Sequence, residues 1–197
     1  LLKKKLKSID SERQVQSKKR KSFFRTSFVG YTNVGKSSLM KSVTKSDVLI
    51  RNQLFATLDT TVRRLFIGDN NYVLLSDTVG FIRNLPDNLI ASFKSTLQEV
   101  VDSNLLLIVL DANSQDLFNE IETIKSVLKE INANEIDYKY VFNKIDLVDP
   151  EKISYLKQSF PDSLMVSATR SLQISDIKDT IAEKYEEWVS ALKNPSH

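Results

Sequence analysis

The stretch Gly30-Tyr-Thr-Asn-Val-Gly35-Lys36-Ser37 decides the fold of this 197-residue chain. It matches the phosphate-binding loop G-x-x-x-x-G-K-[ST], in which glycines let backbone amides approach phosphate oxygens. The match follows an apolar pair, Phe28 and Val29, and opens a helical run from Ser38 to Val43, where a helix N-terminus favours negative charge. A chance match in a glycine-containing turn is the alternative. The chain has only four glycines, however, and two of them fall at the required positions.

Two side chains of this loop are predicted to act on a bound nucleoside triphosphate. Lys36 should reach the β- and γ-phosphate oxygens, and the Ser37 hydroxyl should bind Mg²⁺. The neighbouring positions that we expect to line the phosphates are Asn33, Val34, Gly35 and Ser38.

Short apolar runs alternate with amphipathic helical stretches along most of the chain. The strand-like runs are residues 23–29, 62–67, 72–75, 105–110, 138–142 and 163–166. This alternation predicts an α/β fold. The phosphate loop and the three elements described below, each at the end of a strand, make it a P-loop NTPase G domain. We expect a mostly parallel six-stranded sheet with helices on both faces. Asp87, Asp116 and Asp176 each precede an apolar helical face, where an N-cap is expected.

Asp77-Thr-Val-Gly80 follows the third of these runs and matches the D-x-x-G element of nucleoside triphosphatases. A carboxylate at Asp77 can hold Mg²⁺, usually through water, and the Gly80 amide can contact the γ-phosphate. Without other motifs, a D-x-x-G sequence in a protein is in most cases only part of a turn. Its position after a phosphate loop, at the end of a strand, favours the nucleotide site.

Two further elements point to guanine as the base. Asn143-Lys144-Ile-Asp146 matches N-K-x-D, in which a carboxylate accepts hydrogen bonds from guanine N1–H and the 2-amino group. Adenine offers no such pair, so the site would leave polar groups unpaired with ATP. Ser167-Ala168 suits the last element, in which a backbone amide meets guanine O6, although these two residues alone carry little information.

Composition excludes several other classes of site. Cysteine is absent, which excludes disulfides and thiolate chemistry and fits a reducing compartment, and the sole histidine is His197. No apolar run approaches the ~20 residues of a membrane span, and no signal-peptide pattern is present. We therefore expect a cytoplasmic protein without integral membrane association.

Positive charge is concentrated at one end of the chain, whose net charge is +3. Residues 1–25 hold ten Lys and Arg against Asp10 and Glu12, whereas residues 26–197 carry five more acidic than basic side chains. We divide the chain into a basic helical or linker segment (1–22), a GTP-binding G domain (23–192) and a C-terminal tail (193–197). The basic segment is either a footprint for nucleic acid or a solvated linker.

Three strings together resemble the HflX family of ribosome-associated GTPases, over about Phe23 to Val189. They are the phosphate loop, Leu54-Phe-Ala-Thr57-Leu-Asp-Thr60-Thr61-Val-Arg63, and Asp77-Thr-Val-Gly-Phe-Ile-Arg-Asn-Leu-Pro86. The third string is the most specific. One departure is Thr60, where many family members have proline, but it removes none of the proposed ligands.

The resemblance implies a GTPase that binds the large ribosomal subunit, is stimulated there, and splits stalled or idle ribosomes. We also expect the protein to be a monomer. The resemblance further implies that the family's N-terminal domain lies outside this sequence. Its F-A-T-L string favours Thr57 as the switch threonine that closes on Mg²⁺ and the γ-phosphate, with Thr60 and Thr61 as alternatives. The predicted catalytic set is therefore Lys36, Thr57 and Gly80, and the predicted metal ligands are Ser37, Thr57 and Asp77.

The residue after D-x-x-G is Phe81, where Ras-like proteins place a glutamine that orients the attacking water. Phenylalanine can neither donate nor accept a hydrogen bond, so we expect slow hydrolysis that needs stimulation. Asn33 resembles the asparagine that ligates K⁺ in potassium-activated GTPases, although a plain turn asparagine explains it equally well. The competing hypothesis is a nucleotide-gated binding module with little turnover that acts on another RNA or protein partner.

Overall fold

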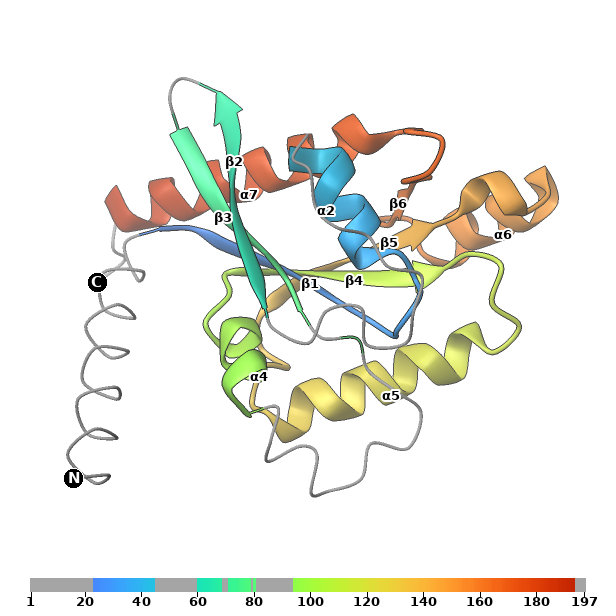
Figure 1. Ribbon diagram of the computed structural model, residues 1–197, viewed down its shortest axis with the longest axis horizontal. Helices are drawn as coiled ribbons and strands as arrows, with labels where there is room; N and C mark the ends of the chain where they lie inside the picture. Colours follow the sequence, from blue (N-terminus) through green and yellow to red (C-terminus); the bar gives the residue numbers. More distant parts are fainter. Residues whose placement is uncertain (1–22, 45–59, 69–70, 79, 81–93, 194–197) are drawn as a thin grey trace.

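A single sheet forms the centre of the molecule (Figure 1). The structure is a computed structural model that describes residues 23–44, 60–68, 71–78, 80 and 94–193. Its strands are β1 (Arg25–Val29), β2 (Thr61–Gly68), β3 (Asn71–Asp77), β4 (Leu105–Asp111), β5 (Asp137–Asn143) and β6 (Leu164–Met165). The spatial order is β2-β3-β1-β4-β5-β6, and every pair is parallel except β2 with β3. The predicted six-stranded, mostly parallel sheet is confirmed.

Helices cover both faces of this sheet. They are α2 (Lys36–Thr44), α4 (Lys94–Val101), α5 (Leu117–Glu130), α6 (Pro150–Ser159) and α7 (Ile174–Lys193), with a short 3-10 turn, η1 (Ile145–Leu147). Figure 1 shows α2 and α7 together on one face and α4 and α5 on the other. None of the helices in the described part of the chain is long and apolar enough to cross a membrane.

The core is built around β4, the longest apolar run of the sequence. Its residues Leu105 to Leu110 are all buried, including side chains that point to opposite faces. Burial on both faces explains why this strand reads as a continuous apolar run instead of an alternating one. Phe24, Tyr185 and Trp188 close the core on the α7 side through edge-on ring contacts.

Helix α6 was not predicted from the sequence, because only Leu156 of its ten residues is fully buried and its amphipathic pattern is weak. Its start is nevertheless well defined locally. The Asp149 side chain accepts a hydrogen bond from the Lys152 amide at 2.7 Å, and Pro150 occupies the first turn, where its missing N–H costs nothing.

The three predicted N-caps have different outcomes. Asp116 does occupy the N-cap of α5, but its side chain makes no capping hydrogen bond and instead accepts from Asn119. The prediction for Asp176 was wrong, because α7 already begins at Ile174 and Asp176 lies in its first turn. Asp87 lies outside the described residues.

Candidate functional site

The five parallel strands end at the same edge of the sheet, and the predicted motifs follow these ends. The first, the phosphate loop, runs from the end of β1 into α2. Lys36 is the first residue of α2 and is only 6% exposed. Its Nζ donates to the carbonyl oxygens of Gly30 at 3.0 Å and Tyr31 at 2.9 Å. The loop thus holds the ammonium group above the N-terminus of the helix.

Burial lowers the pKa of Lys36 to about 8, and the nearby Asp77 carboxylate opposes this shift only in part. Loss of hydration is the larger effect, because the charged form is stabilised by water that the buried site lacks. A negatively charged ligand at this edge would supply the missing stabilisation. The electrostatics therefore favour an anion, and the open N-terminus of α2 adds to that preference.

Ser37 and Asp77 meet next to this lysine. The Ser37 hydroxyl donates to Asp77 Oδ2 at 2.5 Å, which joins the start of α2 to the end of β3, and Asp77 is only 1% exposed. A hydroxyl and a carboxylate are oxygen ligands of the kind that Mg²⁺ prefers, and this ion normally completes its shell with waters and phosphate oxygens. The pair therefore fits the Mg²⁺ that the sequence predicts.

Close packing explains two of the glycines at this edge. A Cβ on Gly80 would lie 2.8 Å from the backbone of Thr32 in the phosphate loop, so D-x-x-G packs directly on that loop. Gly35 has φ 98°, and a Cβ there would overlap the Asn143 side-chain amide. Any side chain at either position would push two of the site's elements apart.

Asn143 ties three of the elements together. This side chain is buried; its Nδ2 donates to the Val34 carbonyl at 2.8 Å, and its Oδ1 accepts from the Ala168 amide at 3.0 Å. The phosphate loop, N-K-x-D and the Ser-Ala element are therefore held in one register by a single amide group. A direct contact between Asn143 and a nucleotide stays a prediction, since its amide already contacts the protein backbone.

Asp111 is a residue of the site that the sequence analysis missed. Its Oδ2 accepts from Lys144 Nζ at 2.7 Å, and its Oδ1 accepts from the Asn113 amide at 2.9 Å. Lys144 itself has a left-handed backbone with φ 65°, so the ion pair holds a strained loop. A signal was available, because Asp111 directly follows the apolar run Leu105–Leu110, as Asp77 follows its own strand.

The base side of the site is formed by η1 and the segment after β6. Asp146 lies exposed in η1. Ser167 is buried and its hydroxyl accepts from the Arg170 amide at 3.1 Å, while the Ala168 carbonyl accepts from Ser42 of α2 at 3.2 Å. The Ser-Ala element is thus fixed both to its own turn and to α2.

The structure brings most of the predicted site residues to this one edge. These are Asn33, Val34, Gly35, Lys36, Ser37, Ser38, Asp77, Gly80, Asn143, Lys144, Asp146, Ser167 and Ala168. Thr57 and Phe81 lie outside the described residues. Of the alternatives to Thr57, Thr61 pairs with Asp77 in the β2–β3 ladder, and Thr60 immediately precedes it. Asn33 has φ 63°, a conformation that suits a turn asparagine.

Comparison with known proteins agrees with this geometry. The family described as "50S ribosome-binding GTPase" matches residues 25–144. GTPase HflX of Flavobacterium psychrophilum is 52% identical over 146 residues, and GTPase HflX of Gluconacetobacter diazotrophicus is 42% identical over 185 residues. The chain belongs to the 50S ribosome-binding GTPases and, within them, to the HflX type. The predicted GTPase class is confirmed with it.

The chain spans about two fifths of the length of these HflX relatives. The alignments cover 74% and 94% of this chain but 35% and 41% of the respective relatives. Among solved structures, a complex of SsGBP with GDP has a TM-score of 0.66 and 26% identity, over 97% of this chain and 58% of the other. The HflX-type G domain described here therefore corresponds to one part of a longer architecture in its relatives.

Proposed function

We propose that this HflX-type domain binds GTP with Mg²⁺ at the carboxyl edge of its sheet and hydrolyses it slowly until stimulated. The observation that carries the proposal is the Asn143 amide group, which joins the phosphate loop to both base-side elements. A site for phosphates and a site for guanine are thereby held at a fixed separation, as one bound nucleotide requires.

The chain's own residues divide the work of phosphoryl transfer. Lys36, whose pKa is lowered by burial, would stabilise negative charge on the β- and γ-phosphates, the hydrogen-bonded pair Ser37 and Asp77 would hold the metal, and the Gly80 amide would contact the γ-phosphate. When bound, Mg²⁺ neutralises charge that develops on the phosphate oxygens. Thr57 is our choice for the residue that closes over the metal, and Asp146 for the reader of the base.

The stimulus is proposed to come from outside the domain. Phe81 stands at the position where Ras-like proteins carry a water-orienting glutamine, and its ring cannot take that role. We propose the large ribosomal subunit as the activator and, for a protein of the full length of the HflX relatives, the splitting of stalled or idle ribosomes in the cytoplasm. The family's description as ribosome-binding supports the first of these steps. We expect the protein to act as a monomer.

Phe81 also favours one second candidate, a nucleotide-gated module with little turnover that acts on another RNA or protein partner. Such a module would bind its partner with different affinities in the GTP-bound and GDP-bound states. Ribosomes would not accelerate its hydrolysis of GTP.

Single-turnover hydrolysis of GTP separates these functions. It is measured with and without large ribosomal subunits, in KCl and in NaCl, for wild type, Asn33→Ala and Phe81→Ala. We expect slow hydrolysis alone, a rise of at least about tenfold with subunits, and no large loss in Phe81→Ala. Stimulation by K⁺ that disappears in Asn33→Ala would add K⁺ as a cofactor. Fast hydrolysis in NaCl without subunits would contradict the proposal, and hydrolysis that subunits leave unchanged would favour the binding module.

A further inference from the structure

Three aromatic rings form a row across one end of the sheet. Phe66 of β2 is paired with Tyr72 of β3, and their ring centroids lie 6.0 Å apart. Phe23, just before β1, stacks on Tyr72 with centroids 5.2 Å apart. This end of β1 and β3 is opposite to the carboxyl edge that carries the nucleotide site. We call Phe66, Tyr72 and Phe23 the aromatic row.

The row is open to solvent. Phe66 is 66% exposed, while Tyr72 and Phe23 are half-buried. The guanidinium carbon of Arg64, an exposed residue on the same side of β2, lies 4.8 Å from the centre of the Tyr72 ring. Leu65 points to the opposite side and is buried there, on the face that α2 and α7 cover.

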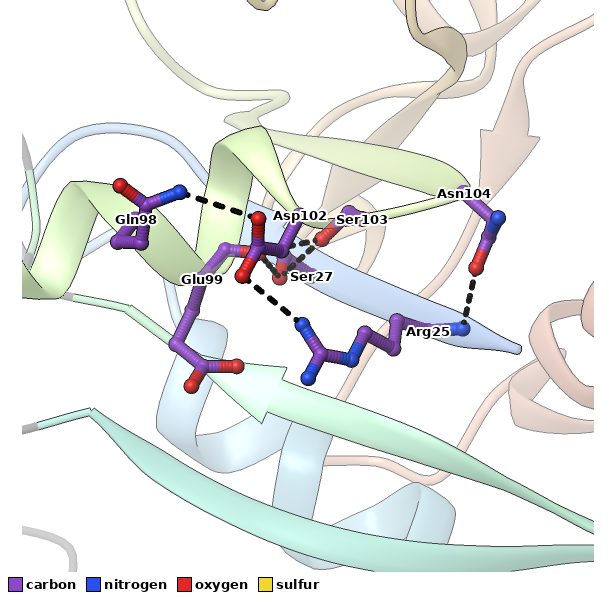
Figure 2. A network of polar contacts seen from close by, with 7 residues as sticks. All are labelled: Arg25, Ser27, Gln98, Glu99, Asp102, Ser103 and Asn104. Carbon is purple, nitrogen blue, oxygen red and sulfur yellow. Dashed lines mark hydrogen bonds and ion pairs between the residues drawn. The ribbon is translucent and has the colours of Figure 1, made fainter. Parts of the chain in front are cut away.

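The reason for this opening is the position of α4. A network of polar contacts fixes the end of that helix over β1 (Figure 2). The Arg25 guanidinium donates to Asp102 at 3.2 Å, and the hydroxyls of Ser27 and Ser103 lie 2.7 Å apart. Helix α4 therefore covers the β1 part of this face, and the β2–β3 pair extends past the helices (Figure 1).

A cluster of exposed aromatic side chains on an edge strand promotes unwanted association between chains unless a binding partner covers it. The charge of the surrounding residues indicates the chemical class of that partner. Strands β2 and β3 carry Arg63 and Arg64 and no carboxylate except Asp77 at the nucleotide edge. The chain also runs directly from the strongly basic residues 1–22 into Phe23, whereas residues 26–197 are net acidic. On the face of the aromatic row, the described charged side chain beside the rings is therefore the cation of Arg64, and the sequence joins the row at Phe23 to a basic segment, which suits a polyanion.

We propose that the aromatic row and Arg64 form a stacking platform for unpaired bases of ribosomal RNA. Bases splayed out of RNA loops stack on aromatic rings and on guanidinium planes, which is the combination found here. Phe66, which is 66% exposed, offers ring surface to a base, and Arg64 adds a cation over the neighbouring Tyr72 ring. The inference deepens the proposed function and rests on it, because it names the surface through which the domain would contact the large subunit.

The test is binding of the GTP-loaded chain to two probes, intact large ribosomal subunits and protein-free RNA extracted from them. The variants are Phe66→Ser and Arg64→Ala, and the matched control is Phe118→Ser, which removes a ring of similar exposure (54%) on α5. Affinity for GDP reports whether each variant is folded. Phe66→Ser is expected to weaken binding to both probes by roughly 5- to 100-fold, since stacking on one ring is worth that much. Phe118→Ser should change neither.

The salt dependence of binding separates the electrostatic role of Arg64 from the stacking role of Phe66. Arg64→Ala should reduce the slope of log affinity against log salt by about one, whereas Phe66→Ser should leave the slope unchanged. If Phe66→Ser binds both probes as wild type does, the platform is overturned, while subunit binding by wild type upholds the proposed function. If Phe66→Ser loses the subunits but not the free RNA, the partner is a protein and the RNA assignment is overturned. Wild type that binds no subunits would defeat the proposed function and this inference with it.

Discussion

At the scale of single residues, Lys36 shows how the phosphate loop is suited to an anion. Its ammonium group is buried, donates to two backbone carbonyls and lies near the Asp77 carboxylate. The resulting pKa of Lys36, about 8, means that a sizeable fraction of the side chain is neutral just above that pH. Phosphate oxygens beside the ammonium favour its charged form and must raise the pKa again on binding.

Binding of a nucleotide should therefore take up a proton above neutral pH. Because the pKa of Lys36 is lowered to about 8 in the free protein and phosphate oxygens raise it, proton uptake per Mg·GDP bound should be clearly larger at pH 8.5 than at pH 6.5. Calorimetric titration in two buffers of different ionisation enthalpy measures this number directly. Equal proton uptake at the two pH values would contradict the role given to Lys36.

Asp111 makes a second prediction at this scale. Its removal leaves Lys144 without its carboxylate partner at 2.7 Å, but both side chains are about a quarter exposed, so water compensates in part. We expect Asp111→Ala to cost about 1 kcal/mol, or roughly a fivefold faster release of GDP. Release is measured by displacement of a fluorescent GDP analogue. The control is Asp137→Ala, which breaks the pair with Lys184 at the opposite end of β5, and equal rates in the two variants would refute the role of Asp111.

At the scale of elements, α4 is fastened to β1 by contacts far apart in the sequence. Arg25 is only 4% exposed and pairs with Asp102, which also accepts from Gln98 at 3.0 Å. The Arg25 amide also donates to the Asn104 side chain at 2.9 Å (Figure 2), and the Asn104 amide donates to the Arg25 carbonyl at 2.8 Å. The Asp102 contacts fix the end of the helix that follows D-x-x-G in the chain, and the Asn104 contacts fix the segment that leads from it into β4.

Arg25→Met should lower the free energy of unfolding by about 2–3 kcal/mol, because it leaves Asp102 without its cation while keeping most of the apolar volume. Asp102→Asn should cost at least as much, because it leaves the Arg25 guanidinium, the more deeply buried partner (5% against 24% exposed), without its anion. Urea unfolding of both single variants and the double variant gives the coupling energy. Strict additivity would show that the pair does not act as a unit.

Elements with a strong local pattern could be predicted from the sequence, and those held by distant contacts could not. The runs that predicted β2 and β4 agree with the observed strands to within one residue at each end, because their burial shows in the residues themselves. The weakly amphipathic α6 was missed, since one buried leucine leaves no periodic signal. The contacts of Arg25 with α4 were equally invisible, because they join residues 77 positions apart.

At the scale of the whole molecule, the site is composite. Motif spacing placed each element at the end of a strand, and the parallel sheet then brought those ends together, so the edge could be predicted before any contact was known. What the motifs did not reveal is how the elements are joined. The bridging amide of Asn143 and the Asp111–Lys144 pair depend on which strand lies beside which, and no local pattern in the sequence encodes that order.

The central claim is that these elements form one site for a guanine nucleotide, and base choice tests it most directly. Competition of GTP, ATP and XTP against a fluorescent GDP analogue should be measured for wild type and Asp146→Asn. Wild type should prefer GTP over ATP by at least about a hundredfold, because ATP leaves the Asp146 carboxylate without its donors. Asp146→Asn should shift the preference towards XTP, since an amide donates where the carboxylate accepted. Equal affinity of wild type for GTP and ATP, or an unchanged preference in Asp146→Asn, would contradict the account.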